Sequence, residues 1–131
     1  MNDLPVYEIL KEAAEKWPMN PAVHDEQGTI NFQELFTEAE KLRIELIRLG
    51  IKSGMGIGMM AGNGRQFIIG IFAAAGTGAA VMPMSPQLKR AEIDDILQEA
   101  NLHAVIDDRS SIQPLDNIKT VIPLKQGSFR F

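Results

Sequence analysis

The sequence predicts an α/β protein with a mainly parallel sheet flanked by helices, a Rossmann-like layered arrangement that also contains a short hairpin. Short uncharged runs bounded by glycine or proline alternate with segments of helical periodicity, as buried parallel strands alternate with crossover helices. Strand, helix and strand follow one another within about 30 residues, the length of a βαβ unit. With 131 residues, 45% of them apolar and 23% charged, the chain has the composition of one globular domain over residues 1–131.

The first 30 residues predict a helix and a hairpin. Asp3 can cap a helix that ends before Pro18. Ala22–His24 and Thr29–Ile30 are two short apolar runs joined by a polar turn that ends in glycine, as a hairpin requires. The expected inner stripe of the helix consists of Ile9, Leu10, Ala13, Ala14 and Trp17.

The clearest helix starts at Asn31. Asn31 and Glu34 have the spacing of a capping box, and Gly50 stands at the position that usually ends a helix in the left-handed conformation. Its inner positions repeat at spacings of four and three and are widened by Phe36 and Ile47. We expect the core side of this helix to consist of Leu35, Ala39, Leu42, Leu46 and Leu49.

The stretch from Met55 to Pro83 predicts the βαβ unit. Met55–Ala61 is an apolar run expected to be buried on both faces, and Ala79–Met82 is a second strand that ends at Pro83. The turn Gly62–Gly64 joins the first strand to a helix with Phe67, Ile68, Ile71, Phe72 and Ala75 at helical spacing. The uncharged run from Gln66 to Leu88 is long enough to cross a bilayer, but its glycines and prolines argue against a spanning helix.

The pattern beyond Pro86 predicts another helix and two strands. Ser85 is a suitable N-cap, and the strands are His103–Asp107 and Thr120–Ile122. The inner helical positions are Leu88, Ile93, Ile96, Leu97 and Ala100.

Composition excludes several classes of function. The net charge of −4 and the scattered basic residues give no attraction to nucleic acid. The absence of cysteine excludes disulfides, thiolate catalysis and cysteine-bound zinc. The first residues do not form a secretory signal, so we expect a cytoplasmic protein with no transmembrane segment.

The residues that could carry chemistry do not form a convincing site, so we expect no catalytic, cofactor-binding or metal-binding residue. The turn at Gly62–Gly64 departs from a dinucleotide fingerprint because Phe67 occupies the third glycine position and Ser85 stands where an acid is needed. His24 and His103 have no second ligand at metal-binding spacing. The remaining candidates are the adjacent acids and a set of methionines that line either a pocket or the core: Asp107, Asp108, Met55, Met59, Met60 and Met82.

Several short motifs occur in an order that resembles the N-terminal part of the adenylate-forming enzymes, over roughly Leu4 to Asp108. This superfamily includes acyl-CoA synthetases, aryl-CoA ligases, luciferases and peptide-synthetase adenylation domains. Met55, Asn31 and the pair Gly76-Thr77 depart from the usual residues of the pattern. The segments that resemble the family's motifs are Pro21-Ala22-Val23, Ile30–Leu35, Leu49–Gly54, Asn63 and Gly78–Pro86.

The resemblance implies an ATP-dependent ligase, similar to acyl-CoA synthetases and fatty-acid–CoA ligases, that joins a carboxylate to AMP and passes the acyl group to the thiol of CoA or of a carrier. It implies ATP, Mg²⁺ and CoA for the parent enzyme, with a small carboxylic acid as substrate. The phosphate loop, the nucleotide-binding motifs and the catalytic lysine of the family would all follow Phe131. The chain itself is therefore expected to be an inactive scaffold piece that binds no cofactor and whose partner is the rest of the adenylation domain.

Two other interpretations stay open at this point. One is a complete small α/β domain that binds a ligand near Gly62–Gly64, at the strand ends. The other is an interaction module that docks through Phe129 and Phe131 near the end of the chain.

Overall fold

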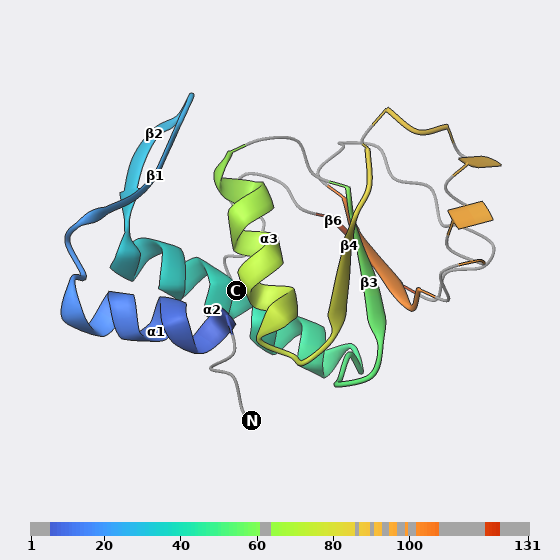
Figure 1. Ribbon diagram of the computed structural model, residues 1–131, viewed down its shortest axis with the longest axis horizontal. Coiled ribbons are helices and arrows are strands. Elements are labelled where there is room, and N and C mark those ends of the chain that lie inside the picture. Colours follow the sequence, from blue (N-terminus) through green and yellow to red (C-terminus); the bar gives the residue numbers. More distant parts are fainter. Residues whose placement is uncertain are drawn as a thin grey trace.

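The computed structural model describes residues 6–60, 64–85, 87–89, 91–92, 95–96, 99, 102–107 and 120–123, with the backbone alone described for residues 107 and 120–123. It contains helices and strands in the alternating order that the sequence predicts (Figure 1). Their bounds are α1 Val6–Lys16, β1 Pro21–Asp25, β2 Gly28–Asn31, α2 Phe32–Arg48, β3 Gly56–Met60, α3 Arg65–Ala75, β4 Ala80–Pro83, β5 Ala104–Asp107 and β6 Thr120–Pro123.

The main sheet has the strand order β4-β3-β5-β6, and each neighbouring pair is parallel. The strands β1 and β2 form a separate antiparallel hairpin, with Asp25 opposite Gly28 at its turn. Figure 1 shows α2 and α3 on one side of the sheet and the hairpin beyond them. The prediction of a mainly parallel α/β fold with one hairpin is therefore confirmed.

The central strand β3 is buried on both faces, as its uncharged sequence predicts. Ile57 and Met59 are fully buried in the main core with α1, α2 and α3. Met60 is fully buried on the opposite face, where it packs with Met84 and Val105. Successive side chains of a strand point to opposite faces, so β3 supplies both cores at once.

The long helix α2 begins with the predicted capping box. The Glu34 N–H donates to the Asn31 side-chain oxygen at 2.8 Å, and the Asn31 N–H donates to the Glu34 carboxylate at 2.8 Å. The predicted inner residues Leu35, Ala39, Leu42 and Leu46 are buried. Two other predicted core residues lie outside this face: Leu49 is 43% exposed and Ile47 is 46% exposed.

The exposure of these two residues has a simple geometric cause. Leu49 is the C-cap residue, and Gly50 turns the chain back with a φ of +94°, so the buried stripe ends one turn earlier. Ile47 lies about 100° around the helix from Leu46, on the flank of the buried face.

The predicted stripe on α1 is only partly correct. Tyr7 and Leu10 are the buried residues of the helix, whereas Ile9 is 53% exposed and Trp17 is 52% exposed. The Tyr7 hydroxyl donates a hydrogen bond to Glu40, and the guanidinium of Arg43 lies 5.3 Å from the centre of the Tyr7 ring. The face that meets α2 is thus centred on Tyr7, and Ile9 points away from it. Asp3, the predicted cap, lies outside the described residues.

The face of α3 that packs against the core consists mainly of small residues, not of the large apolar residues that the sequence pattern predicts. Its buried residues are Ile69, Gly70, Ala73 and Ala74, whereas the predicted residues Phe67, Ile68, Ile71 and Phe72 are only partly buried and pack around the core. Small side chains at the deepest positions let neighbouring elements approach closely. At the end of the helix, a Cβ added to Gly76 would come within 2.8 Å of the Tyr7 ring.

The remaining expectations fall largely on residues that are not described. After Pro86, the backbone is helical at residues 91–92, 95–96 and 99, and Leu88, Ile96 and Leu102 pack against the second core. Ile93, Leu97, Ala100, Gly62, Asn63, Asp108, Phe129 and Phe131 lie outside the described residues. Within the described part of the chain, no helix is long and apolar enough to cross a membrane.

Replacing Leu42 with alanine should destabilise the fold by about 2–5 kcal/mol, because Leu42 is fully buried and its truncation leaves a cavity. Urea denaturation followed by circular dichroism measures this change. Ile44→Ala on the same helix is the control, since Ile44 is 47% exposed and should lose far less stability. Equal losses in the two variants would contradict the assignment of the buried face.

Candidate functional site

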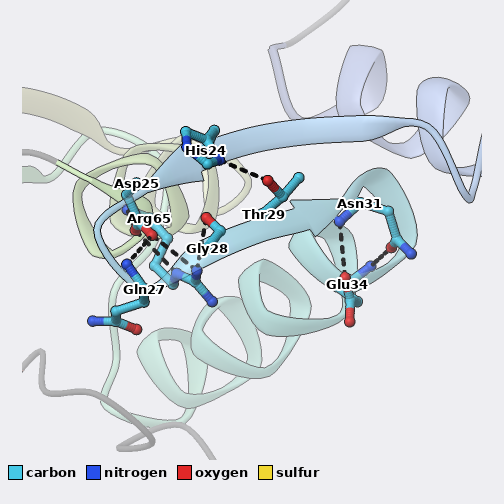
Figure 2. Close-up of polar contacts among 8 residues, drawn as sticks. All are labelled: His24, Asp25, Gln27, Gly28, Thr29, Asn31, Glu34 and Arg65. Atoms are coloured by element: carbon cyan, nitrogen blue, oxygen red, sulfur yellow. Dashed lines mark hydrogen bonds and ion pairs between the residues drawn. The ribbon is translucent and has the colours of Figure 1, made fainter.

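The most elaborate polar cluster joins the hairpin turn to the start of α3 (Figure 2). The Arg65 guanidinium donates through Nε to Asp25 Oδ2 at 3.0 Å and through Nη2 to Asp25 Oδ1 at 2.9 Å. The Arg65 backbone N–H donates to Asp25 Oδ2 at 2.9 Å, and Nη2 also reaches the Gly28 carbonyl at 3.2 Å. Both side chains are mostly covered, with 18% of Arg65 and 12% of Asp25 exposed.

These contacts hold Asp25 in its ionised form. The side-chain hydrogen bonds from Arg65 are the main cause, followed by the backbone N–H of Arg65 and that of Gln27, and together they hold the pKa of the Asp25 carboxyl far below its usual range. The same pair raises the pKa of Arg65. Asp25 and Arg65 are therefore both charged across the range of pH in which proteins usually work.

The ion pair also settles what the start of α3 offers to a ligand. The first N–H groups of a helix carry partial positive charge and attract anions. Here the Asp25 carboxylate already accepts from the first helical N–H and from the Arg65 side chain. Gly62 and Asn63, which the sequence places in the turn before α3, lie outside the described residues, so the expectation that this turn is not a dinucleotide site stays a prediction.

The sequence alone does not reveal this pair. Arg65 is the single charged residue between Lys52 and Lys89, and Asp25 belongs to the polar turn of the hairpin. A cation in the first turn of a helix is electrostatically unfavourable, which is a signal that favours an acid nearby. The identity of that acid, 40 residues earlier in the chain, follows only from the fold.

A shallow hollow of about 510 Å³ lies beside the ion pair and is lined by His24, Asp25, Glu26, Gln27, Gly64 and Gln66. His24 Nδ1 is 2.7 Å from the Thr29 hydroxyl across the hairpin, which fixes the ring on the strand. Among the described residues, no three His, Asp or Glu side chains lie close enough together to hold a metal ion.

His103, the other histidine, bonds to the backbone at the start of β3. Its backbone N–H donates to the Gly56 carbonyl at 2.8 Å, and its Nδ1 accepts from the Gly56 N–H at 3.2 Å. The imidazole thus supplies an acceptor to a backbone donor at the start of β3. Because the ring uses Nδ1 as an acceptor, its proton is placed on Nε2.

The methionines and Asp107 that the sequence indicates as candidates lie in the two cores, on the exposed strand β4 and at the end of β5. Met59 and Met60 are fully buried in the two cores, Met55 packs against the main core, and Met82 is 40% exposed on β4. Asp107 is the last residue of β5, in register with Met60 of β3. The structure brings none of these residues together with the Asp25–Arg65 pair in the described contacts.

Comparison with known proteins identifies what the fold is similar to. The sequence pattern of the family described as AMP-binding enzyme matches residues 10–130. Tyrocidine synthase 3 of Brevibacillus parabrevis is 29% identical over 112 residues, which are 86% of this chain and 2% of that protein.

Two solved structures have the same fold. The N-terminal subdomain of Klebsiella oxytoca NpsA has a TM-score of 0.79 at 20% identity and is matched over 91% of this chain and 31% of its own. The O-succinylbenzoate coenzyme A synthetase MenE from Bacillus subtilis, solved in complex with AMP, has a TM-score of 0.80 at 20% identity, over 92% of this chain and 32% of its own. This chain thus spans about a third of either structure.

Asp25→Asn should lower the melting temperature by several degrees. The amide keeps one acceptor oxygen but places an NH₂ group against the donors of Arg65, so two charge-assisted hydrogen bonds are lost. Differential scanning fluorimetry measures the shift. Glu45→Gln removes the exposed pair between Glu45 and Arg48 and should leave the melting temperature nearly unchanged. A similar shift in both variants would argue against the Asp25–Arg65 anchor.

The wild-type chain should be more stable than Asp25→Asn at neutral pH, and this difference in stability should shrink as the pH falls. The pKa of Asp25 is lowered by folding, so the unfolded chain takes up the proton first, near the ordinary aspartate value of about 3.9. The contribution of Asp25 is then complete above about pH 5 and decreases as the pH falls below about 4. Melting temperatures of both chains from pH 7 to pH 3 test this, and a gap that widens with acidification would be the opposite result.

Proposed function

This chain belongs to the AMP-binding enzyme family, and from that premise we propose that it forms the N-terminal third of a larger adenylate-forming domain. The observation that carries the proposal is the family match over residues 10–130, together with a fold similar to 31% of the chain of the NpsA N-terminal subdomain. In the complete domain, a carboxylate oxygen attacks the α-phosphorus of ATP, an acyl-adenylate forms and pyrophosphate leaves. A thiol then attacks the acyl carbonyl and AMP leaves.

The activated acid in this proposal is an amino acid and the acceptor is the thiol of a carrier protein. A relative of Glarea lozoyensis supports it, because it is named nonribosomal peptide synthetase gloA and aligns with 88% of this chain at 25% identity. Coenzyme A as the acceptor is the second candidate. The fold of MenE, a coenzyme A synthetase, is as similar to this chain as the fold of NpsA is. Activation of a fatty acid, which the sequence resemblance first suggested, has no support among these relatives.

The role of this chain within the domain is that of a scaffold. At the start of α3 the carboxylate of Asp25 accepts from the N–H of Arg65 and from Nε and Nη2 of its guanidinium, so the cation of this helix start is paired with an acid of the same chain. The electrostatic stabilisation of a phosphoryl transfer needs free positive groups aimed at the developing charge. We therefore assign no catalytic residue to this chain and expect ATP and Mg²⁺ to be held by other parts of the domain.

Carboxylate-dependent exchange of labelled pyrophosphate into ATP tests the proposal. The protein encoded by the complete reading frame should show exchange with at least one amino acid in a panel that also contains aryl and fatty acids. The chain of residues 1–131 alone should show none, and calorimetric titration of it with Mg-ATP should give no heat of binding. Exchange catalysed by residues 1–131 alone would overturn the scaffold role, and exchange with fatty acids only would overturn the amino-acid assignment.

A further inference from the structure

The edge strand β4 is exposed although its sequence is apolar and uncharged, which is unusual for a strand in contact with water. In the described part of the chain, β4 lies at one end of the sheet order, beside β3. Three of its four residues, Ala80, Met82 and Pro83, are exposed, and Met82 is 40% exposed. Parallel strands are usually covered on both faces by the connections between them, and their sequences are therefore apolar throughout.

The sequence around β4 lacks the protection that exposed edges normally have. Natural proteins place charged side chains, especially lysine, on edge strands to prevent association with other chains. Gln66 to Leu88 contains no charged residue, and β4 lies in the middle of it. Pro83, which has no N–H to offer, is the single protective device on this strand.

The uncovered face can be assigned from the register of the strands. Met82 is opposite Gly58 on β3, and Gly58 lies on the face of the second core, with Met84 and Leu102 packed over it. Val81 is opposite Ile57 and packs against the main core under the helices. Among the described residues, those of the second core cover β3 and β5 and do not include Ala80 or Met82.

The backbone of β4 has a free side as well. The Ala80 N–H donates to the Met55 carbonyl and the Met84 N–H donates to the Met59 carbonyl. In a parallel pair every second residue bonds to the neighbouring strand, so Ala80, Met82 and Met84 face β3, whereas the N–H and C=O groups of Val81 point away from it. Val81 thus presents an outward N–H, which lies beside the exposed apolar side chains.

We propose that the exposed flank of β4, formed by Ala80, Met82 and the outward backbone of Val81, is the docking surface for the remainder of the adenylate-forming domain. This inference rests on the proposed function. The chain spans about a third of the similar structures, so in the proposed domain other segments need a surface of this fold to pack on. An uncharged parallel edge with one exposed face suits that packing, because it removes apolar area from water and covers a backbone donor.

Hydrogen exchange of residues 1–131 alone and of the complete protein tests the surface. In the complete protein, the Val81 amide should exchange at least about tenfold more slowly than in the isolated chain, because the docked segment restricts access to it. Equal exchange in the two proteins would overturn the proposal.

A pair of substitutions tests it without requiring the isolated chain to fold. In the complete protein, Met82→Lys should lower the melting temperature by several degrees, because the charge would be buried in the interface. Met19→Lys is the matched control, since Met19 is 72% exposed in the loop after α1 and should tolerate lysine. Equal effects of the two substitutions would overturn the proposal.

Two results separate this interface from the proposed function. A protein that shows no pyrophosphate exchange but is destabilised by Met82→Lys and not by Met19→Lys would contradict the function and support the interface. A concentration-dependent dimer of residues 1–131 that persists in the complete protein and is abolished by Met82→Lys would instead make a second copy the occupant, and would overturn the proposed docking.

Discussion

The structure depends on β3 being buried on both faces. Its alternating side chains supply Ile57 and Met59 to the core under α2 and α3, and Met60 to the smaller core on the other side. Gly58 lets Met84 approach so closely that an added Cβ would lie 2.6 Å from the sulfur. Because one strand takes part in both cores, the helices on one side and the chain after β4 on the other are held in a fixed relation to the same backbone.

The elements with regular local signals could be predicted from the sequence. The uncharged run of β3, the capping box of Asn31 and Glu34, and the glycine-ended hairpin each have a local physical cause, and all three are present. The inner face of a helix is harder to predict when apolar residues extend around it. Ile9 of α1 fits the periodicity as well as Leu10 does, and only the position of Tyr7 against α2 decides which of them is buried.

The candidate site was the least predictable part, because it consists of residues that are far apart in the sequence. The hydrogen bond of Asn31 lies within one turn of helix, whereas Asp25 meets Arg65 across 40 residues. What the sequence does contain is the unfavourable position of Arg65 at the start of a helix, where a nearby acid would stabilise it. The contact with Asp25 provides that acid and occupies the first N–H of the helix.

The separation between Asp25 and Arg65 also bears on how the chain folds. The hairpin and α2 are neighbours in sequence, so their contacts close only short loops and can form early. The ion pair joins residues 40 apart, a separation similar to the 47 residues between Ile57 of β3 and its partner Ala104 of β5. We therefore expect the attachment of the hairpin to α3 to form later than the hairpin itself and the capped start of α2, at a stage comparable with assembly of the sheet.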